Sequence, residues 1–540
     1  MKNKNNFLII FILALTIGLI YQGTYIIFSQ QFDRESKNGV VLISNSVSQK
    51  YVWNRTWGGA SNDYGYGVAV DSSNNVYLAG YTPSFGAGGN DVVLVKYDSS
   101  GVQQWYRTWG GGGFDVGYGV AVDSADNVYV SGVTESFGAG STDLVLVKYD
   151  DSGVQQWYRT WGDDDIDGAY GVAVDSSDNI YITGYTQSFG VGMYDIAVVK
   201  YDGAGTQLWN ETWGGGGPDM GYGVVTDSVN NVYIGGVTSF GAGGNDMVIV
   251  KYNSIGVQLW NFTWGGTKYD EGYRVTVDSE DNIYLAGYTS SFGPGFADMV
   301  IVKYNNIGVQ LWNRTWGGSM DEFGWGVATD SADDVYLAGY TSSFGAGSYD
   351  MVVVKYDDFG VQQWNKTWGG VSTDYNTDIA TDNNDNIYLA GYTASFGEGM
   401  FDMILVKFAL DFDNPQINII SPSQGDKIGD IAPNYDISIV EANLKSIWYT
   451  IDGGITNYTI AQLSGTINQS AWHIAPYSNI TIRFYANDLL GYIGYNEVVV
   501  EKVEEVEEKD GGPAIFGYNL LIIISLIGMI TAIIQKRKSN

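Results

Sequence analysis

The sequence predicts an all-β protein made of a closed seven-bladed β-propeller, a small β-sandwich and a C-terminal transmembrane helix. Two observations predict the propeller. A Thr-Trp-Gly tripeptide recurs along most of the chain with a period of 52 residues, once 51. Each repeat contains four β-branched or aromatic runs separated by Gly, Asp, Asn and Ser clusters, which is the strand content of one propeller blade.

The first expected element is an export segment over residues 1–30, followed by a linker over residues 31–50. Lys2 and Lys4 precede an almost wholly apolar stretch over residues 7–20, and apolar residues resume at 25–28. A basic start before an apolar block is typical of a signal peptide. The full stretch is also long enough to span a bilayer, so a retained signal anchor stays open.

The seven repeats are expected to form the propeller over residues 51–410. The seventh repeat stops at Phe408 without a fourth run, whereas residues 51–57 are a fourth run that belongs to no repeat. We therefore expect the N-terminal strand to complete the last blade and remove an open sheet edge. An open β-solenoid is the alternative. The repeated tryptophans are expected to pack between blades, and they are Trp57, Trp109, Trp161, Trp213, Trp264, Trp316 and Trp368.

The hairpin of each repeat carries a family resemblance. The segment VAVDSSNNVYLAGYT and its relatives VAVDSADNVYVSGVT and VTVDSEDNIYLAGYT resemble the SBBP-type seven-bladed β-propeller repeats of prokaryotic exported proteins. The resemblance covers about two thirds of the chain. It implies the fold and not an activity, because propellers support many functions.

Residues 411–502 are expected to form an immunoglobulin-like β-sandwich. The 52-residue period ends there, and shorter alternating runs begin, as in small sandwich domains. The segment resembles the immunoglobulin-like spacers of prokaryotic surface proteins. A spacer role is therefore expected.

The C-terminal end is expected to attach the protein to a membrane. An acidic, glycine-containing linker over residues 503–513 precedes about 21 mostly apolar residues at 514–534 and a basic tail at 535–540. A helix of that length crosses a bilayer, and the cations at both tips place the intervening chain outside. The segment also resembles archaeal sorting segments, so the helix is either retained or processed. The predicted localisation is the cell membrane, with most of the chain extracellular and the C-terminus cytoplasmic.

Composition narrows the function. The 540 residues include 27 Lys and Arg against 60 Asp and Glu, a net charge of −33, so a nucleic-acid partner is not expected. The chain has no cysteine and only one histidine, His473. These counts exclude disulfides, thiolate nucleophiles and metal sites built from several imidazoles.

Two kinds of site residue stand out. Eight Asn-x-Ser/Thr sequons are candidate glycosylation sites, at Asn54, Asn210, Asn261, Asn313, Asn365, Asn457, Asn468 and Asn479. Asp163, Asp165 and Asp167 alternate before a glycine, which resembles the start of a calcium loop. The twelfth position of that loop is Val174 and not the usual glutamate. Calcium is therefore a possible cofactor, against a solvated acidic loop.

The expected function is binding rather than catalysis. The repeats offer no nucleophile or acid–base pair that breaks the sevenfold equivalence, and a reacting centre needs one such constellation. We expect multivalent recognition of a protein or glycan at the cell surface, in adhesion or as an envelope scaffold. The alternatives are a calcium-dependent glycan-binding module and a glycosidase or lyase on an acidic, glycine-lined crown of loops.

Overall fold

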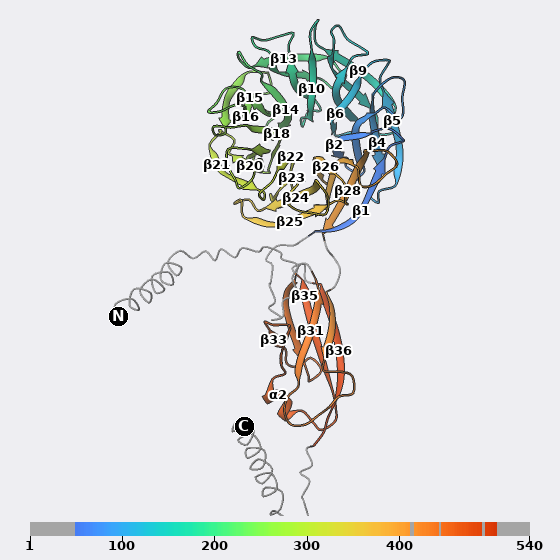
Figure 1. Ribbon diagram of the computed structural model, residues 1–540, viewed down its shortest axis with the longest axis vertical. Helices are drawn as coiled ribbons and strands as arrows, with labels where there is room; N and C mark the ends of the chain where they lie inside the picture. The colour runs from blue at the N-terminus through green and yellow to red at the C-terminus, as the bar shows by residue number, and fades with distance from the viewer. Residues whose placement is uncertain (1–48, 411–414, 442–443, 489–491, 505–540) are drawn as a thin grey trace, which may run out of the picture. The chain divides into compact units, whose positions relative to one another are not determined.

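The structure is a computed structural model that describes residues 49–410, 415–441, 444–488 and 492–504. The chain divides into two compact units, one over Asn45–Asp413 and another that includes the chain from Asn414 onward. The first unit is a ring of antiparallel four-stranded sheets (Figure 1). In each sheet the first strand lies nearest the centre of the ring and the last lies on the rim.

Seven sheets have four strands. The innermost strands are β2 (Tyr64–Val70), β6 (Asp115–Val122), β10 (Asp167–Val174), β14 (Met220–Thr226), β18 (Asp270–Val277), β22 (Glu322–Thr329) and β26 (Asp374–Thr381). The second strands are β3 (Val76–Thr82), β7 (Val128–Thr134), β11 (Ile180–Thr186), β15 (Val232–Thr238), β19 (Ile283–Thr289), β23 (Val335–Thr341) and β27 (Ile387–Thr393). The third strands are β4 (Asp91–Tyr97), β8 (Asp143–Tyr149), β12 (Asp195–Tyr201), β16 (Asp246–Tyr252), β20 (Asp298–Tyr304), β24 (Asp350–Tyr356) and β28 (Asp402–Leu410). The outermost strands are β5 (Gln103–Trp109), β9 (Gln155–Trp161), β13 (Gln207–Trp213), β17 (Gln258–Trp264), β21 (Gln310–Trp316), β25 (Gln362–Trp368) and, in the last sheet, β1 (Gln49–Trp57).

The strand sequences follow from this packing. A third strand such as β4 lies inside a sheet that packs between two others, so all seven of its residues are buried. It therefore reads as a nearly continuous apolar run. The outermost strand β5 faces solvent on the rim and exposes its two glutamines and Tyr106. Apolar clusters lie between neighbouring sheets, so the core of the ring is divided among the sheet interfaces.

The turn between the first and second strands uses aspartate as a backbone acceptor. Oδ1 of Asp71 accepts hydrogen bonds from the amides of Ser73 (2.9 Å) and Asn75 (2.8 Å). Asn74 has φ of 62°, a left-handed conformation that asparagine and aspartate tolerate better than most residues. The same conformation recurs at Asp126, Asp178, Asn230, Asp281, Asp333 and Asp385.

The first strand of the chain completes the last sheet. β1 pairs antiparallel with β28, from Gln49 opposite Leu410 to Trp57 opposite Met403. Its Trp53 and Trp57 are buried in the apolar cluster that joins the last sheet to the first. The two ends of the repeat region are therefore held together by a ladder of hydrogen bonds and by packing.

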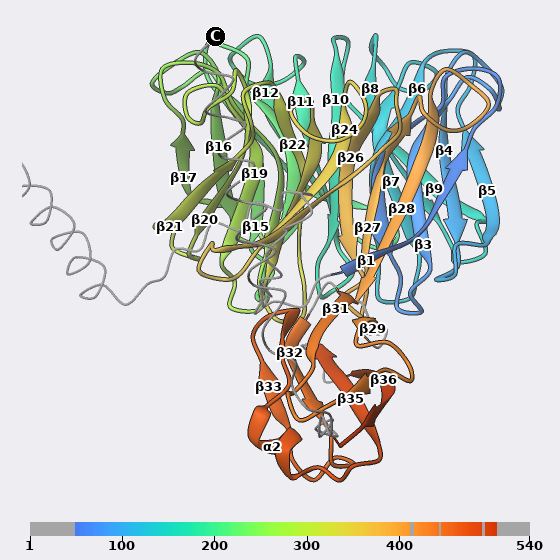
Figure 2. The same ribbon diagram turned by 60° about the horizontal axis from the view of Figure 1, so that its bottom comes forward.

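The second unit has a three-stranded and a five-stranded sheet around one core. The core surrounds the fully buried Trp472 of helix α2 (Gln469–Ile474), and Nε1 of Trp472 donates to the carbonyl oxygen of Gly429 at 2.9 Å. The smaller sheet contains β29 (Gln416–Ser421), β31 (Asn434–Val440) and β34 (Ser464–Thr466). The larger contains β30 (Lys427–Ile428), β36 (Ile493–Lys502), β35 (Asn479–Asp488), β32 (Leu444–Thr450) and β33 (Tyr458–Ile460). Figure 2 shows these strands in a second view. The immunoglobulin-like relationship stays a prediction.

The predicted fold class needs correction. The described residues hold nine sheets, two more than the repeats supply, because the segment after the repeats adds the two sheets of the second unit. The predicted fold class also includes a C-terminal transmembrane helix, and the predicted localisation is the cell membrane. In the described part of the chain no helix is long and apolar enough to cross a membrane, because its apolar runs form strands and α2 has only six residues. This finding corrects the predicted fold class and the predicted membrane localisation for the described part of the chain, and it gives no support to the predicted membrane partner.

Several predicted segments lie outside the described residues. They are the export segment at 1–30, most of the linker at 31–50, the span at 514–534, the tail at 535–540 and most of the linker at 503–513.

Candidate functional site

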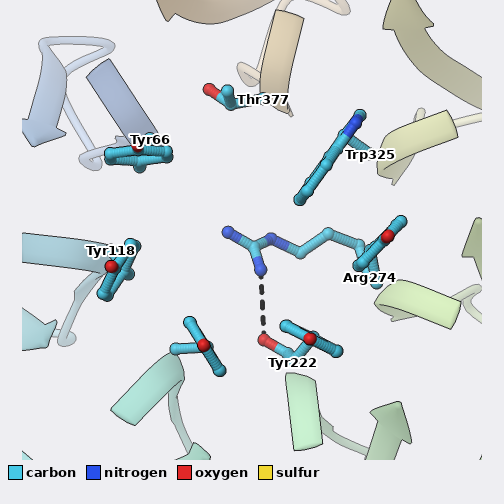
Figure 3. Close-up of a pocket in the computed structure, with 8 residues that line it drawn as sticks. Tyr66, Tyr118, Tyr222, Arg274, Trp325 and Thr377 are labelled. Carbon is cyan, nitrogen blue, oxygen red and sulfur yellow. Dashed lines mark hydrogen bonds between the residues drawn. The ribbon is translucent and has the colours of Figure 1, made fainter. Parts of the chain in front are cut away.

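A cavity of about 240 Å³ lies among the innermost strands of the ring (Figure 3). Each of these strands contributes the residue at the same repeat position, and Arg274 is the eighth lining residue. The seven equivalent residues are Tyr66, Tyr118, Tyr170, Tyr222, Tyr273, Trp325 and Thr377. The cavity is therefore walled mainly by aromatic rings.

A local irregularity of the strand positions each of these side chains. In the pairing of β2 with β3 the register shifts between Gly65 and Gly67, so Tyr66 has no partner residue in the ladder. The same shift occurs at the equivalent residue of the other six innermost strands. A bulge of this kind redirects a side chain that strand alternation would place elsewhere. Here it aims one residue of every sheet at the cavity.

The aromatic side chains form a continuous arc. Neighbouring ring centroids are 5.1 Å apart for Tyr66 and Tyr118 and 4.7 Å apart for Tyr170 and Tyr222. The arc ends at Trp325, which stacks on Tyr273 at 4.0 Å with an interplanar angle of 7°. Burial raises the pKa of each lining tyrosine well above its ordinary value. The phenols are therefore protonated at neutral pH, and those of Tyr222 and Tyr273 donate to Sδ of Met220 (3.4 Å) and to Oε2 of Glu271 (2.8 Å).

Thr377 leaves a gap in this arc because its side chain is short. Its hydroxyl is already used, since Oγ1 donates toward the carbonyl oxygens of Gly65 (3.0 Å) and Ala390 (3.1 Å). The gap is thus a fixed feature of the wall.

Arg274 places a positive charge in the cavity. Its Nη1 donates to the carbonyl oxygen of Tyr222 at 3.1 Å, and its Nε lies 3.4 Å from Oδ1 of Asp378. Figure 3 shows the guanidinium reaching from β18 toward the side of the cavity that holds Tyr66 and Tyr118. No hydrogen bond of its Nη2 to any described residue is found.

Asp378 holds the arginine from the far side of β22. Its Oδ2 accepts a hydrogen bond from the amide of Val68 at 3.1 Å, so both carboxylate oxygens are engaged. Burial raises the pKa of Asp378 above its ordinary value, whereas the Arg274 charge and the Val68 amide act to lower it.

These two residues break the sevenfold pattern, and the sequence analysis missed them. At this position the other five sheets carry Gly67, Gly119, Gly171, Gly223 and Gly326. Glycine is required by close approach there, since a Cβ on Gly67 would lie 2.8 Å from the carbonyl oxygen of Tyr118. An alignment of the seven repeats at the residue after the bulge would have revealed both exceptions.

The expected acidic crown is largely buried. Asp115 is fully buried, and its carboxylate accepts from Thr134 Oγ1 (2.5 Å), Ser136 Oγ (2.6 Å) and the amide of Gly111 (2.8 Å). Oδ2 of Asp91 accepts from the amides of two residues in its own loop. Equivalent carboxylates recur around the ring and are also buried. These aspartates shape loops, which leaves less free charge on that face than the sequence indicated.

The three predicted calcium ligands differ in their exposure and in their hydrogen bonds. Oδ2 of Asp167 accepts from Ser188 Oγ at 2.5 Å and from the amide of Asp163 at 3.1 Å, as its counterparts in other sheets do. Asp163 and Asp165 are exposed, whereas Asp167 is fully buried. Within the described ranges, no group of three or more acidic, histidine or cysteine side chains is arranged to hold a metal ion. Calcium binding at this loop stays a prediction.

The repeated tryptophans end the outermost strands and contact the next sheet. Trp57 of the last sheet lies 5.1 Å, ring centroid to centroid, from Phe85 of the first. Equivalent contacts join Trp109, Trp161, Trp213, Trp264, Trp316 and Trp368 to Phe137, Phe189, Phe240, Phe292, Phe344 and Phe396. Each Ser-Phe-Gly loop therefore supplies an aromatic contact between sheets.

The sequon asparagines differ in exposure. Asn54 is half-buried, and its Nδ2 donates to the Tyr51 hydroxyl at 2.9 Å. Exposed side chains are found at Asn210, Asn261, Asn313, Asn365, Asn457, Asn468 and Asn479. Asn468 also caps α2 by accepting from the amide of Ala471.

Comparison with known proteins supports the repeat assignment. Residues 56–84, 162–190 and 263–293 match a family model described as Beta-propeller repeat, abbreviated SBBP. The predicted resemblance to that repeat is confirmed for these segments. The chain is also 23% identical to an uncharacterized WD repeat-containing protein of Acanthamoeba polyphaga mimivirus over an alignment that covers 64% of this chain. It covers only 36% of that relative.

The solved structures that the chain matches are distant from it. The extracellular domain of a hybrid two-component system from B. thetaiotaomicron has 12% identity and a TM-score of 0.38, with 84% of this chain and 57% of that chain covered. PorZ, a surface component of the type-IX secretion system of Porphyromonas gingivalis, has 12% identity and a TM-score of 0.44, with 82% and 60% covered. The chain thus spans less than two thirds of either protein.

Proposed function

We propose that the protein is a non-catalytic binding propeller whose ligand enters the cavity at the centre of the ring. One observation carries this proposal. Arg274 and Asp378, the two residues that stand in place of glycine after the bulge, pair with each other at the centre of the ring. Arg274 lines the cavity directly, and Asp378 holds the guanidinium.

The cost of the pair supports a role beyond structure. Glycine serves at this position in five sheets, so the ring does not need a charge there. Burying a guanidinium and a carboxylate at the centre of the ring costs desolvation free energy that the pairing only partly recovers. Ligand binding would explain why the chain carries a charged pair at these two positions in place of glycine.

The cavity volume limits the ligand. Pockets that take drug-sized molecules usually hold about 300–1,000 Å³, and this one holds about 240 Å³. A small molecule, or a single side chain of a larger protein or glycan partner, fits that volume. A single central site also gives one ligand per ring, so multivalent binding would need other surfaces.

A catalytic role has less support. The lining residues offer phenols, one indole, one hydroxyl that is already used and one guanidinium. The nearest carboxylate, Asp378, has both oxygens engaged, so no free general base faces the cavity among the described lining residues. A crown-face glycosidase is likewise weakened by the burial of the loop carboxylates, and export stays a prediction.

Peptide and glycan arrays probed with the full chain test the proposal. Thr377→Tyr restores the residue that five other sheets carry at this position and fills the gap in the aromatic arc. We expect ligands found with the natural chain to be lost with Thr377→Tyr. The rim variant Tyr106→Ser, which alters an exposed side chain of β5, should keep them. Ligands that bind Thr377→Tyr unchanged would show that the cavity is not the binding site.

A further inference from the structure

We propose that the central cavity recognises a carboxylate group, which pairs with the free N–H groups of Arg274. This inference rests on the proposed function, because it assigns a ligand chemistry to the same cavity. The carboxylate would enter with an apolar or aromatic group attached, which the tyrosine walls would cover.

The donors of Arg274 are only partly used. A guanidinium has five N–H groups in a fixed planar arrangement. One on Nε is taken by Asp378 and one on Nη1 by the Tyr222 carbonyl oxygen. The Nη2 nitrogen bonds to no described residue and lies on the part of the guanidinium that reaches into the cavity (Figure 3). The remaining N–H groups form the kind of edge that binds a carboxylate through two parallel hydrogen bonds.

The positive charge of Arg274 disfavours a cationic ligand. A ring of tyrosines alone would suit a cation through the negative faces of its rings. Arg274 already places a permanent positive charge among these rings, so a second cation would be repelled. The protonated phenol of Tyr118, on the side of the cavity toward which the guanidinium reaches, adds a neutral donor, which favours a ligand with acceptor oxygens.

The Asp378 carboxylate favours a singly charged anion over a doubly charged one. The carboxylate lies next to the guanidinium, but Asp378 is not among the residues that line the cavity, so the guanidinium faces the ligand while the pair as a whole carries no net charge. A doubly charged phosphate would meet stronger repulsion from Asp378 than a singly charged carboxylate. The cavity of about 240 Å³ also has room for a carboxylate with one small apolar group. Such a group could come from a free acid or from the end of a peptide.

Calorimetric titration of the full chain tests this with two matched pairs of probes. The first pair is 3-phenylpropanoate and 3-phenylpropanamide, which differ in charge and not in shape. The second is a Gly-Gly-Gly-Phe peptide with a free C-terminal carboxylate or with a C-terminal amide. We expect at least one acid to bind about tenfold or more tighter than its amide, as a charge-assisted pair implies. The pair that shows the difference identifies the source.

Two variants separate the role of the arginine from effects on folding. Arg274→Gly with Asp378→Gly gives both sheets the glycine of the other five, so the ring should fold, and thermal melting checks this. The preference for acid over amide should disappear in this double variant. An acid that keeps its preference there, or failure of all four probes to bind the natural chain, would overturn the carboxylate inference.

A different result would contradict the proposed function. It would be wrong if every array ligand bound the Thr377→Tyr variant as well as it binds the natural chain. If array ligands do respond while the acids show no preference over the amides, the cavity is a binding site and the carboxylate inference alone is wrong.

Discussion

Arg274 and Asp378 form an ion pair between two strands that are not neighbours, since β22 lies between β18 and β26. Nε of Arg274 is 3.4 Å from Oδ1 of Asp378, and their side chains are only 19% and 14% exposed. The pair therefore links the sheet of β18 to the sheet of β26 through the centre of the ring. Its residues are 104 positions apart in the chain.

The coupling of this pair can be measured by a double-mutant cycle. Arg274→Gly leaves the Asp378 carboxylate without its counter-ion, and we expect a loss of about 2 kcal/mol in the free energy of unfolding. Asp378→Gly introduced into that variant should recover at least half of the loss, because it removes the unpaired charge. Chemical denaturation of the four proteins gives the coupling energy. Additive effects would mean that the pair does not interact.

The first strand should be essential to the ring. Deleting residues 49–57 exposes the edge of β28 and removes Trp53 and Trp57 from the core between the last and first sheets. We expect strong destabilisation and self-association, measured by thermal melting and light scattering. Trp53→Ala alone keeps the strand and should cost about 3–5 kcal/mol through the lost packing. A deletion variant that melts like the natural chain and stays monomeric would contradict this role.

Much of the sheet content could be predicted from the residues. The run at 91–97 is apolar because β4 is buried on both faces, and the Asp and Asn pattern at 71–75 marks a turn that needs the left-handed conformation found at Asn74. Both features depend on local chemistry, which a sequence displays directly. The SBBP resemblance rests on the same hairpin.

The central site could not be predicted in the same way. In a regular strand, successive side chains point to opposite faces of the sheet. The bulge at Tyr273 shifts this alternation by one residue, so the residues after it point to the other face. Which residues then meet across the ring depends on its closure, since Arg274 and Asp378 come from sheets that are not adjacent. The burial of Asp115 could not be predicted either. A loop of glycine, serine and aspartate has the same composition whether its carboxylate is exposed or buried, so composition does not indicate the exposure of that carboxylate.

The stability of the ring should depend on pH through Asp298. Burial first, then the nearby charges of Glu322 and Asp321, raises the pKa of Asp298 from 3.8 to about 6. In the folded state this group keeps a proton that the unfolded chain releases. Its contribution to stability is therefore full below pH 3.8 and is lost as the pH rises through about 6.

Asp298→Asn tests this dependence. Removing the charge should raise the melting temperature by about 2 °C or more at pH 8 and have little effect at pH 4. Asp164→Asn, in an exposed loop, is the matched control and should change neither value. An equal shift of Asp298→Asn at both pH values would indicate a packing effect and not a titration.

Asp167 should act as a loop acceptor with or without calcium. Its carboxylate accepts from Ser188 and from the Asp163 amide, and Asp167→Ala leaves both donors unsatisfied. We expect a loss of about 1–3 kcal/mol that is the same in calcium and in chelator. Asp165→Ala, at an exposed position, should stay within about 0.5 kcal/mol of the natural chain. A loss for Asp167→Ala that appears only with calcium, together with a calcium-dependent effect of Asp165→Ala, would support a metal site at this loop.

Glycosylation, if the chain is made in a host that modifies sequons, should be uneven along the rim. Asn261 is exposed on β17, whereas Asn54 is half-buried and its Nδ2 donates to the Tyr51 hydroxyl at 2.9 Å. Because Nδ2 is the atom that receives the glycan, we expect lower occupancy at Asn54 than at Asn261 when glycopeptides are quantified by mass spectrometry. Tyr51→Phe removes the acceptor and should raise the occupancy of Asn54 without changing that of Asn261. Equal occupancy at both sites in the natural chain would mean that this hydrogen bond does not limit access to the asparagine.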